Sequence, residues 1–214
     1  MIMGANGVKR IILIFCLMVL GCGIDHVYGM NEAVITNIKG DAQIIRNGQT
    51  QPANVNETFQ KGDTLKTDDG AVVDISMNNM VGYRVLASSE STIVNTDESA
   101  MQVKINRGRI IANIEKLSKT STFKVETPTA IASVRGTQFS GAVDFKMPDN
   151  PNTTFAVREG AINVLSVSTG ETFTVNEGMA LDVPHDILGP LNTRGAIGTE
   201  LAALDQASSV RTCS

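Results

Sequence analysis

Between residues 33 and 183, apolar and polar positions alternate in short runs that Gly, Asn and Asp interrupt. Alternation with a period of two predicts strands with one buried face, and no segment here keeps helical spacing over three turns. The pattern predicts an all-β domain of many short strands, either a twisted β-solenoid or a sandwich-like form. Examples of the predicted strands are 34–38, 42–46, 72–76, 102–106, 110–114, 122–126, 155–158 and 162–165.

Internal similarity adds to this picture. Residues 62–75 align without a gap with residues 170–183, and both predict a strand, an acidic-Gly turn and a second strand. A shorter unit occurs three times and ends at Gly40, Gly108 and Gly160, each followed by an alternating strand. Such repetition favours stacked, similar coils over a two-domain chain. The alternative is that any β protein repeats its hairpins.

The character of the chain changes after Pro184. Several Gly and Pro residues predict a loop, and Thr199 is a candidate cap for a short helix that reaches residue 207. Leu201 and Leu204 would lie on one side of that helix. We therefore expect a domain at 33–184 and a partly disordered extension at 185–214, with disorder over 208–214.

The N-terminus has the pattern of a secretory signal peptide. Lys9 and Arg10 precede an apolar run at 11–20, which is short for a membrane-spanning helix. Cleavage before Met30 would make 1–29 the signal peptide, and we favour this slightly. A lipoprotein box ending at Cys22 is the alternative, with 1–21 removed and Cys22 lipidated. Either site predicts export to the periplasm or cell envelope, and lipidation predicts an outer-membrane lipoprotein.

Composition excludes several kinds of chemistry. Hydrophobic residues make up 42% of the chain but aromatic residues only 4%, so the core must consist of Val, Ile, Leu and Ala. A net charge of −4 without a basic run argues against nucleic-acid binding. Cys16 lies in the apolar run, which leaves at most Cys22 and Cys213 at opposite ends of the chain, so a disulfide framework or a Cys-based zinc site is not expected. Of the two histidines, His26 precedes Met30 and His185 alone cannot make a zinc site. We predict no catalytic residues, no metal and no cofactor, and hence no enzyme.

Residues 127–139 run Thr-Pro-Thr-Ala-Ile-Ala-Ser-Val-Arg-Gly-Thr-Gln-Phe. This run resembles the signature of the FecR domain family, and Gly-Asp-Thr-Leu-Lys-Thr at 62–67 is similar to an upstream motif of that family. The resemblance covers about 34–183 and implies an extracytoplasmic all-β domain. In the best-known members, this domain helps a sigma-factor regulator relay a signal from an outer-membrane transporter. Only ten residues precede the apolar run here, so a cytoplasmic sigma-binding segment is not expected. The signature residues carried over are Thr127, Pro128, Arg135, Gly136, Thr137 and Phe139.

The signature also has a physical interpretation of its own. Pro128 lacks an N–H and suits a strand start or edge, and Gly136 permits a bend. Val134 and Phe139 flank that bend and should be buried. Arg135 either fixes the bend by pairing with carbonyls or a carboxylate, which we favour, or contacts a ligand.

Two functions remain open. The first is an exported, non-catalytic binding or scaffold module of the cell envelope. Its partner would be an envelope protein, a peptide or a glycan; we expect no nucleic acid, and membrane contact only through a lipid anchor. The second is a regulatory or sensory component of envelope signalling, related to sigma-factor regulators. The oligomeric state stays open.

Overall fold

The computed structural model describes residues 32–205, apart from 116, 148 and 187–189. The predicted signal peptide, both processing sites including Cys22, and the predicted disordered tail lie outside the described residues. The strands are β1 (Ala33–Lys39), β2 (Ala42–Arg46), β3 (Gln49–Pro52), β4 (Thr58–Phe59), β5 (Thr64–Thr67), β6 (Val72–Met77), β7 (Val81–Val85), β8 (Glu90–Asn95), β9 (Met101–Ile114), β10 (Phe123–Glu126), β11 (Ala130–Val134), β12 (Gln138–Met147), β13 (Asn150–Glu159), β14 (Ala161–Ser166), β15 (Thr172–Asn176), β16 (Met179–Pro184) and β17 (Arg194–Gly195). The helix is α2 (Gly198–Asp205).

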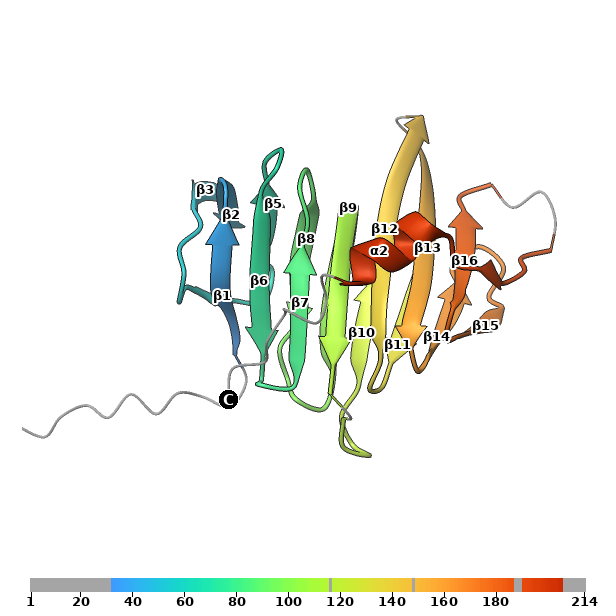
Figure 1. Ribbon diagram of the computed structural model, residues 1–214. Coiled ribbons are helices and arrows are strands. Elements are labelled where there is room, and N and C mark those ends of the chain that lie inside the picture. Colours follow the sequence, from blue (N-terminus) through green and yellow to red (C-terminus); the bar gives the residue numbers. More distant parts are fainter. Residues whose placement is uncertain (1–31, 116, 148, 187–189, 206–214) are drawn as a thin grey trace, which may run out of the picture.

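The strands form two stacked layers (Figure 1). The front layer has the order β4-β1-β6-β7-β9-β12-β13-β16-β17. The back layer has the order β3-β2-β5-β8-β9-β10-β11-β14-β15. Neighbours are antiparallel except for the parallel pair of β9 and β10. The chain returns repeatedly from one layer to the other, so the prediction of an all-β domain of many short strands is confirmed.

Strand β9 belongs to both layers. Its first half pairs with β8 and β10 in the back, and its second half pairs with β7 and β12 in the front. The sequence predicts two separate strands, 102–106 and 110–114, but the structure has one strand of 14 residues. Gly108 lies at the crossing with a φ of 81°. A glycine tolerates this conformation, so the strand bends there without ending.

The hydrophobic core fills the space between the layers. Strands such as β11 and β14 alternate buried and less buried positions, as a strand with one face on the core must. The largest fully buried side chains include Tyr83, Phe123, Phe139 and Phe155, and most of the remaining core is aliphatic. This matches a chain rich in Val, Ile, Leu and Ala.

The sequence repeats correspond to equivalent corners of the fold. Residues 62–75 contain β5 and the start of β6, while residues 170–183 contain β15 and most of β16. Each pair of strands passes from the back layer to the front layer. The shorter repeated unit marks three further crossings, at Gly40, Gly108 and Gly160, which supports the prediction of similar stacked units.

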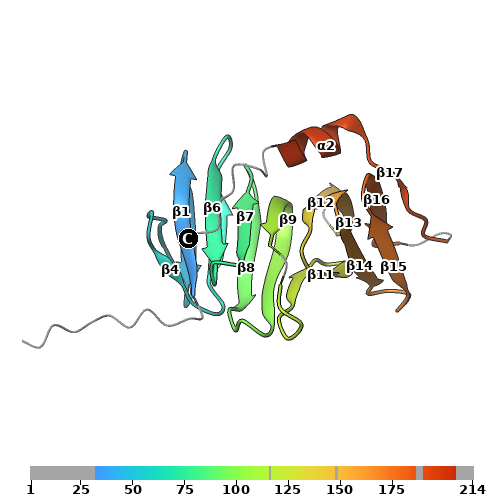
Figure 2. The ribbon, with the colours of Figure 1, turned by 60° about the horizontal axis from the view of Figure 1, so that its bottom comes forward.

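Helix α2 lies on the outer side of the front layer, across β12 and β13 (Figures 1 and 2). Its Leu204 packs against Ile111 of β9. The predicted helix is present, but the expected cap is wrong, because Thr199 lies inside the first turn. Instead the Glu200 carboxylate accepts a hydrogen bond from the Ile197 N–H (2.9 Å), in the manner of a capping box. In the described part of the chain, no helix is long and apolar enough to span a membrane.

Candidate functional site

The first half of the signature forms an internal hydrogen-bonded link. The buried Thr127 hydroxyl accepts from the Ala130 N–H (3.0 Å) and from the Thr153 hydroxyl (2.9 Å). Thr129 Oγ1 lies 2.7 Å from both Thr153 Oγ1 and the Val183 carbonyl oxygen. These hydroxyls tie the turn before β11 to β13 and β16. Pro128, between them, is exposed in the turn.

The second half of the signature turns the chain from the back layer into the front layer. Gly136 has a φ of 88°, and exposed Arg135 donates to the carbonyl oxygens of Ser118 (3.3 Å) and Lys119. Thr137 donates through Oγ1 to the Ala161 carbonyl (3.1 Å). Phe139 is fully buried with its ring centroid 6.5 Å from that of Phe155. Each of these contacts lies within the fold.

A groove of about 430 Å³ borders Arg135 and Gly136. The Arg135 guanidinium is already bonded to the backbone carbonyls of Ser118 and Lys119. A ligand in this groove would have to compete with these two carbonyls for the guanidinium donors that they occupy.

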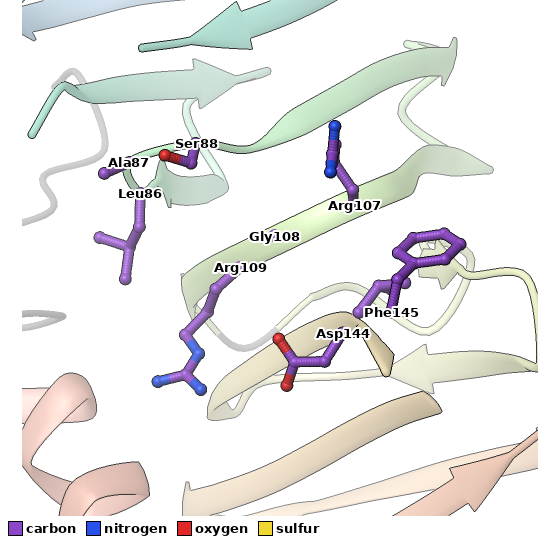
Figure 3. A pocket seen from close by; sticks show the side chains of 9 residues that line it. Leu86, Ala87, Ser88, Arg107, Gly108, Arg109, Asp144 and Phe145 are labelled. Atoms are coloured by element: carbon purple, nitrogen blue, oxygen red, sulfur yellow. The ribbon is translucent and has the colours of Figure 1, made fainter. Parts of the chain in front are cut away.

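A groove of about 480 Å³ lies where β9 crosses between the layers (Figure 3). Three segments that are distant in sequence line it: the turn after β7, the crossing of β9, and the end of β12. The lining residues are Leu86, Ala87, Ser88, Arg107, Gly108, Arg109, Val143, Asp144 and Phe145. We call this the crossing groove.

Buried hydrogen bonds hold the floor of the crossing groove in place. Thr67 Oγ1 donates to the Leu86 carbonyl (2.6 Å) and accepts from the Ser89 N–H (3.0 Å). The Ser89 hydroxyl in turn accepts from the Arg109 N–H (2.9 Å). Ser88, between these anchors, has a φ of 54°, a region that non-glycine residues rarely occupy. The backbone of the groove is therefore preorganised by its surroundings.

The side chains of the crossing groove combine charge with an exposed aromatic ring. Phe145 is 41% exposed, which is unusual in a chain with so few aromatic residues. Figure 3 shows the Arg109 guanidinium and the Asp144 carboxylate on the same side of β9, with Arg107 extending to the other side. Among the described residues, neither arginine forms an ion pair with a carboxylate. Two guanidinium groups thus remain available to a ligand.

This arrangement suits recognition of a protein segment. A guanidinium presents a planar fork that pairs with carboxylates through two parallel hydrogen bonds. Exposed aromatic and Arg side chains are also the residue types that most often dominate binding energies at interfaces. The sequence singled out Gly108 only as the end of a repeated unit, and it did not single out Arg109, Asp144 or Phe145. The spacing Arg-Gly-Arg around a crossing glycine was the signal that could have found the groove.

Other polar clusters are less promising. His185 Nδ1 lies 3.1 Å from the neighbouring Asp186 carboxylate, and both side chains are exposed. Within residues 32–205, gaps excepted, no group of three or more His, Cys, Asp or Glu side chains could hold a metal ion.

Comparison with known families identifies the central part of the chain. Residues 63–163 match the family described as FecR protein. This match confirms, over residues 63–163, the resemblance carried by the signature. All residues that line the crossing groove fall inside the matched segment.

Solved structures share the fold. Two crystal structures of a candidate anti-sigma factor from Parabacteroides distasonis ATCC 8503, at 1.65 Å and 2.50 Å resolution, each superpose with a TM-score of 0.56. Each is 14% identical to this chain and covers 67% of it. The match covers 64% of that protein, slightly less than two thirds of its length. No curated protein sequence matches this chain.

Proposed function

We propose that this chain is a non-catalytic regulatory protein of envelope signalling, which acts by binding a protein partner in the crossing groove. The FecR domain supports a signalling role, and a similar fold occurs in a protein described as a candidate anti-sigma factor. On this support we favour the regulatory function over the general scaffold that the sequence also suggested.

The observation that carries the proposal is that Arg107 and Arg109, on opposite sides of β9, line the same groove as exposed Phe145. Hydrogen bonds of the buried Thr67 and Ser89 fix the backbone of this groove. A preorganised surface loses little conformational entropy when a partner binds. The partner that fits is a segment with a carboxylate for the guanidinium groups and an apolar side chain for the phenyl ring.

We further propose that the protein is exported, on the strength of the basic residues and apolar run at the N-terminus. Mass spectrometry of the mature N-terminus in the native host tests this. A chain that starts at Met30, or at a lipidated Cys22, supports export. An intact Met1 contradicts export.

Deletion of the gene followed by transcript profiling tests the regulatory function. We expect a defined set of transcripts to change and to return to normal when the wild-type protein is restored. The double variant Arg107→Glu/Arg109→Glu should fail to restore them because it reverses the charge of the groove. Lys124→Glu is the matched control, since Lys124 is exposed on the outer face of the back layer and should restore them fully.

An unchanged transcript profile after deletion would contradict the regulatory function. Full restoration by the double variant would instead show that the crossing groove is not the surface through which the protein acts.

A further inference from the structure

We propose that β15 is an open sheet edge that accepts an extended segment of a partner protein as an additional strand. The segment would be uncharged in its centre and basic at both ends. This inference concerns a second surface and does not depend on the crossing groove.

The four edges of the two layers differ in how they are protected. The front layer ends in β4 and β17, which have two residues each. One edge of the back layer is β3, which ends in Pro52. Short strands and proline are the usual means by which proteins prevent an edge from pairing with another chain.

The remaining edge, β15, lacks such protection. Its five residues, Thr-Phe-Thr-Val-Asn, include no charged residue and no proline. In the described part of the chain β15 pairs only with β14, and Figure 1 shows it at the end of the fold. Thr, Phe and Val favour strand pairing, so this is an edge suited to accept a further strand.

The register defines which backbone groups face outward. The Ser166 N–H donates to the Glu171 carbonyl (2.9 Å) at the start of the β14–β15 hairpin. Because hydrogen-bonded positions alternate along an antiparallel pair, Phe173 and Val175 bond to β14. The N–H and C=O groups of Thr172, Thr174 and Asn176 therefore point toward the open edge.

The charges beside the edge define the occupant. Exposed Glu171 and Glu177 flank the strand at its two ends, and neither forms an ion pair within the described residues. Antiparallel pairing of two copies about Thr174 would bring Glu171 of each copy opposite Glu177 of the other. Like charges opposite each other destabilise a strand pair, whereas basic residues at both ends of a partner strand would stabilise it.

An apolar patch next to β15 supports the proposal that this edge binds an added strand. Leu165 is 37% exposed and pairs across the strands with Thr172 of β15, and Val167 in the adjoining loop is 56% exposed. On the other side of Leu165 lies Ile131 of β11. An added strand would place its outward side chains in line with this patch, which would bury apolar surface together with the backbone groups.

The test uses a synthetic peptide, acetyl-Lys-Thr-Val-Thr-Val-Thr-Lys-amide, and amide hydrogen exchange of the protein followed by NMR. With peptide at about 1 mM and a Kd of about 0.1 mM, exchange at Thr172, Thr174 and Asn176 should slow about tenfold. Exchange at Phe173 and Val175 should change little, because β14 already bonds them. A peptide with Glu in place of both Lys residues should bind at least about tenfold more weakly.

Thr174→Pro should abolish this protection, because it removes an outward N–H without removing a bond to β14. Thr174→Val is the matched control, since it keeps the N–H and should bind like the wild type. Three results would each overturn the proposal: no slowing at the alternate amides, equal binding of the Lys and Glu peptides, or binding that survives Thr174→Pro. Sedimentation of the protein without peptide can give a fourth contradicting result. If the wild-type protein is a dimer and Thr174→Pro dissociates it, the edge is assigned to a second copy of this chain.

Discussion

Ser89 and Gly108 touch at the floor of the crossing groove, so closely that no side chain fits between them. A Cβ atom added to Gly108 would lie 2.6 Å from the Ser89 Cα and 2.2 Å from its Oγ. The same Ser89 hydroxyl accepts the Arg109 N–H. The close approach of the turn before β8 to β9 therefore fixes the backbone that carries both arginines of the groove.

Gly108→Ala should destabilise the protein by about 3 kcal/mol, because overpacking costs about 1–3 kcal/mol in addition to about 1–2 kcal/mol of left-handed backbone strain. Gly48→Ala separates the two effects. Gly48 has a φ of 78° but nothing within 4 Å of the added atom, so only the strain of about 1–2 kcal/mol applies. Urea unfolding of both variants provides the measurement, and equal losses would contradict the close approach.

The buried hydroxyl of Tyr83 should make the stability of the protein fall at alkaline pH. Its hydroxyl is fully buried without a hydrogen-bond partner among the described residues, and burial raises the pKa of Tyr83 above the ordinary tyrosine value of about 10. The unfolded chain loses this proton near pH 10 while the folded chain keeps it. The contribution of Tyr83 to the free energy of unfolding is therefore constant below about pH 10, and that free energy falls as the pH rises further.

Tyr83→Phe should flatten this alkaline loss and raise stability at neutral pH by about 1 kcal/mol, since it removes an unsatisfied buried hydroxyl. A chain that starts at Met30 has Tyr83 as its single tyrosine, so tyrosinate absorbance reports it alone. Absorbance should appear only together with unfolding. Ionisation in the folded protein, or a large loss of stability in the variant, would contradict burial without a partner.

Arg135→Ala should lower the stability of the protein without weakening the binding of a partner. Its guanidinium donates to the carbonyls of Ser118 and Lys119, so Arg135→Ala should cost about 1.5 kcal/mol, the low end for a charged hydrogen bond, because the site is exposed. Arg107→Ala should stay within about 0.5 kcal/mol of the wild type, since among the described residues that side chain has no such partner. Denaturant unfolding distinguishes the two. If Arg135→Ala proved as stable as the wild type, Arg135 would not hold the bend.

Phe139 tests the core. It is fully buried and packs near Phe155, so Phe139→Ala should cost about 3–5 kcal/mol. Thermal unfolding measures this, and an unchanged melting temperature would contradict the burial of β12 on the core.

Much of the fold follows from the sequence because strand alternation and turn residues are local signals. The sequence predicted that Val134 and Phe139 are buried on either side of the bend, which is confirmed, and the repeats predicted similar stacked units. The sequence did not predict that β9 is continuous. A glycine that bends a strand cannot be told from a glycine that ends one by the sequence alone. The predicted division into a signal peptide, a domain at 33–184 and an extension stays a prediction.

The crossing groove could not be predicted from the sequence for a different reason. Leu86, Arg109 and Phe145 come from three segments, and only the pairing of β9 with β7 and β12 brings them together. Taken singly, Arg109 is indistinguishable from a solvated charge and Phe145 from a core residue at the end of a strand. The signature residues were visible in the sequence because they lie in one continuous run, 127–139, that resembles a family motif.

Photo-crosslinking in living cells tests the central claim most directly. Phe145 is replaced by benzoylphenylalanine, which keeps an aromatic ring in the crossing groove, and the same group at Lys124 serves as the control. We predict one reproducible crosslinked protein from position 145 that is lost with Arg107→Glu/Arg109→Glu and is not obtained from position 124. Removal of that protein should change the same transcripts as deletion of this chain. The absence of a specific crosslink from position 145, or equal crosslinking from both positions, would contradict the account.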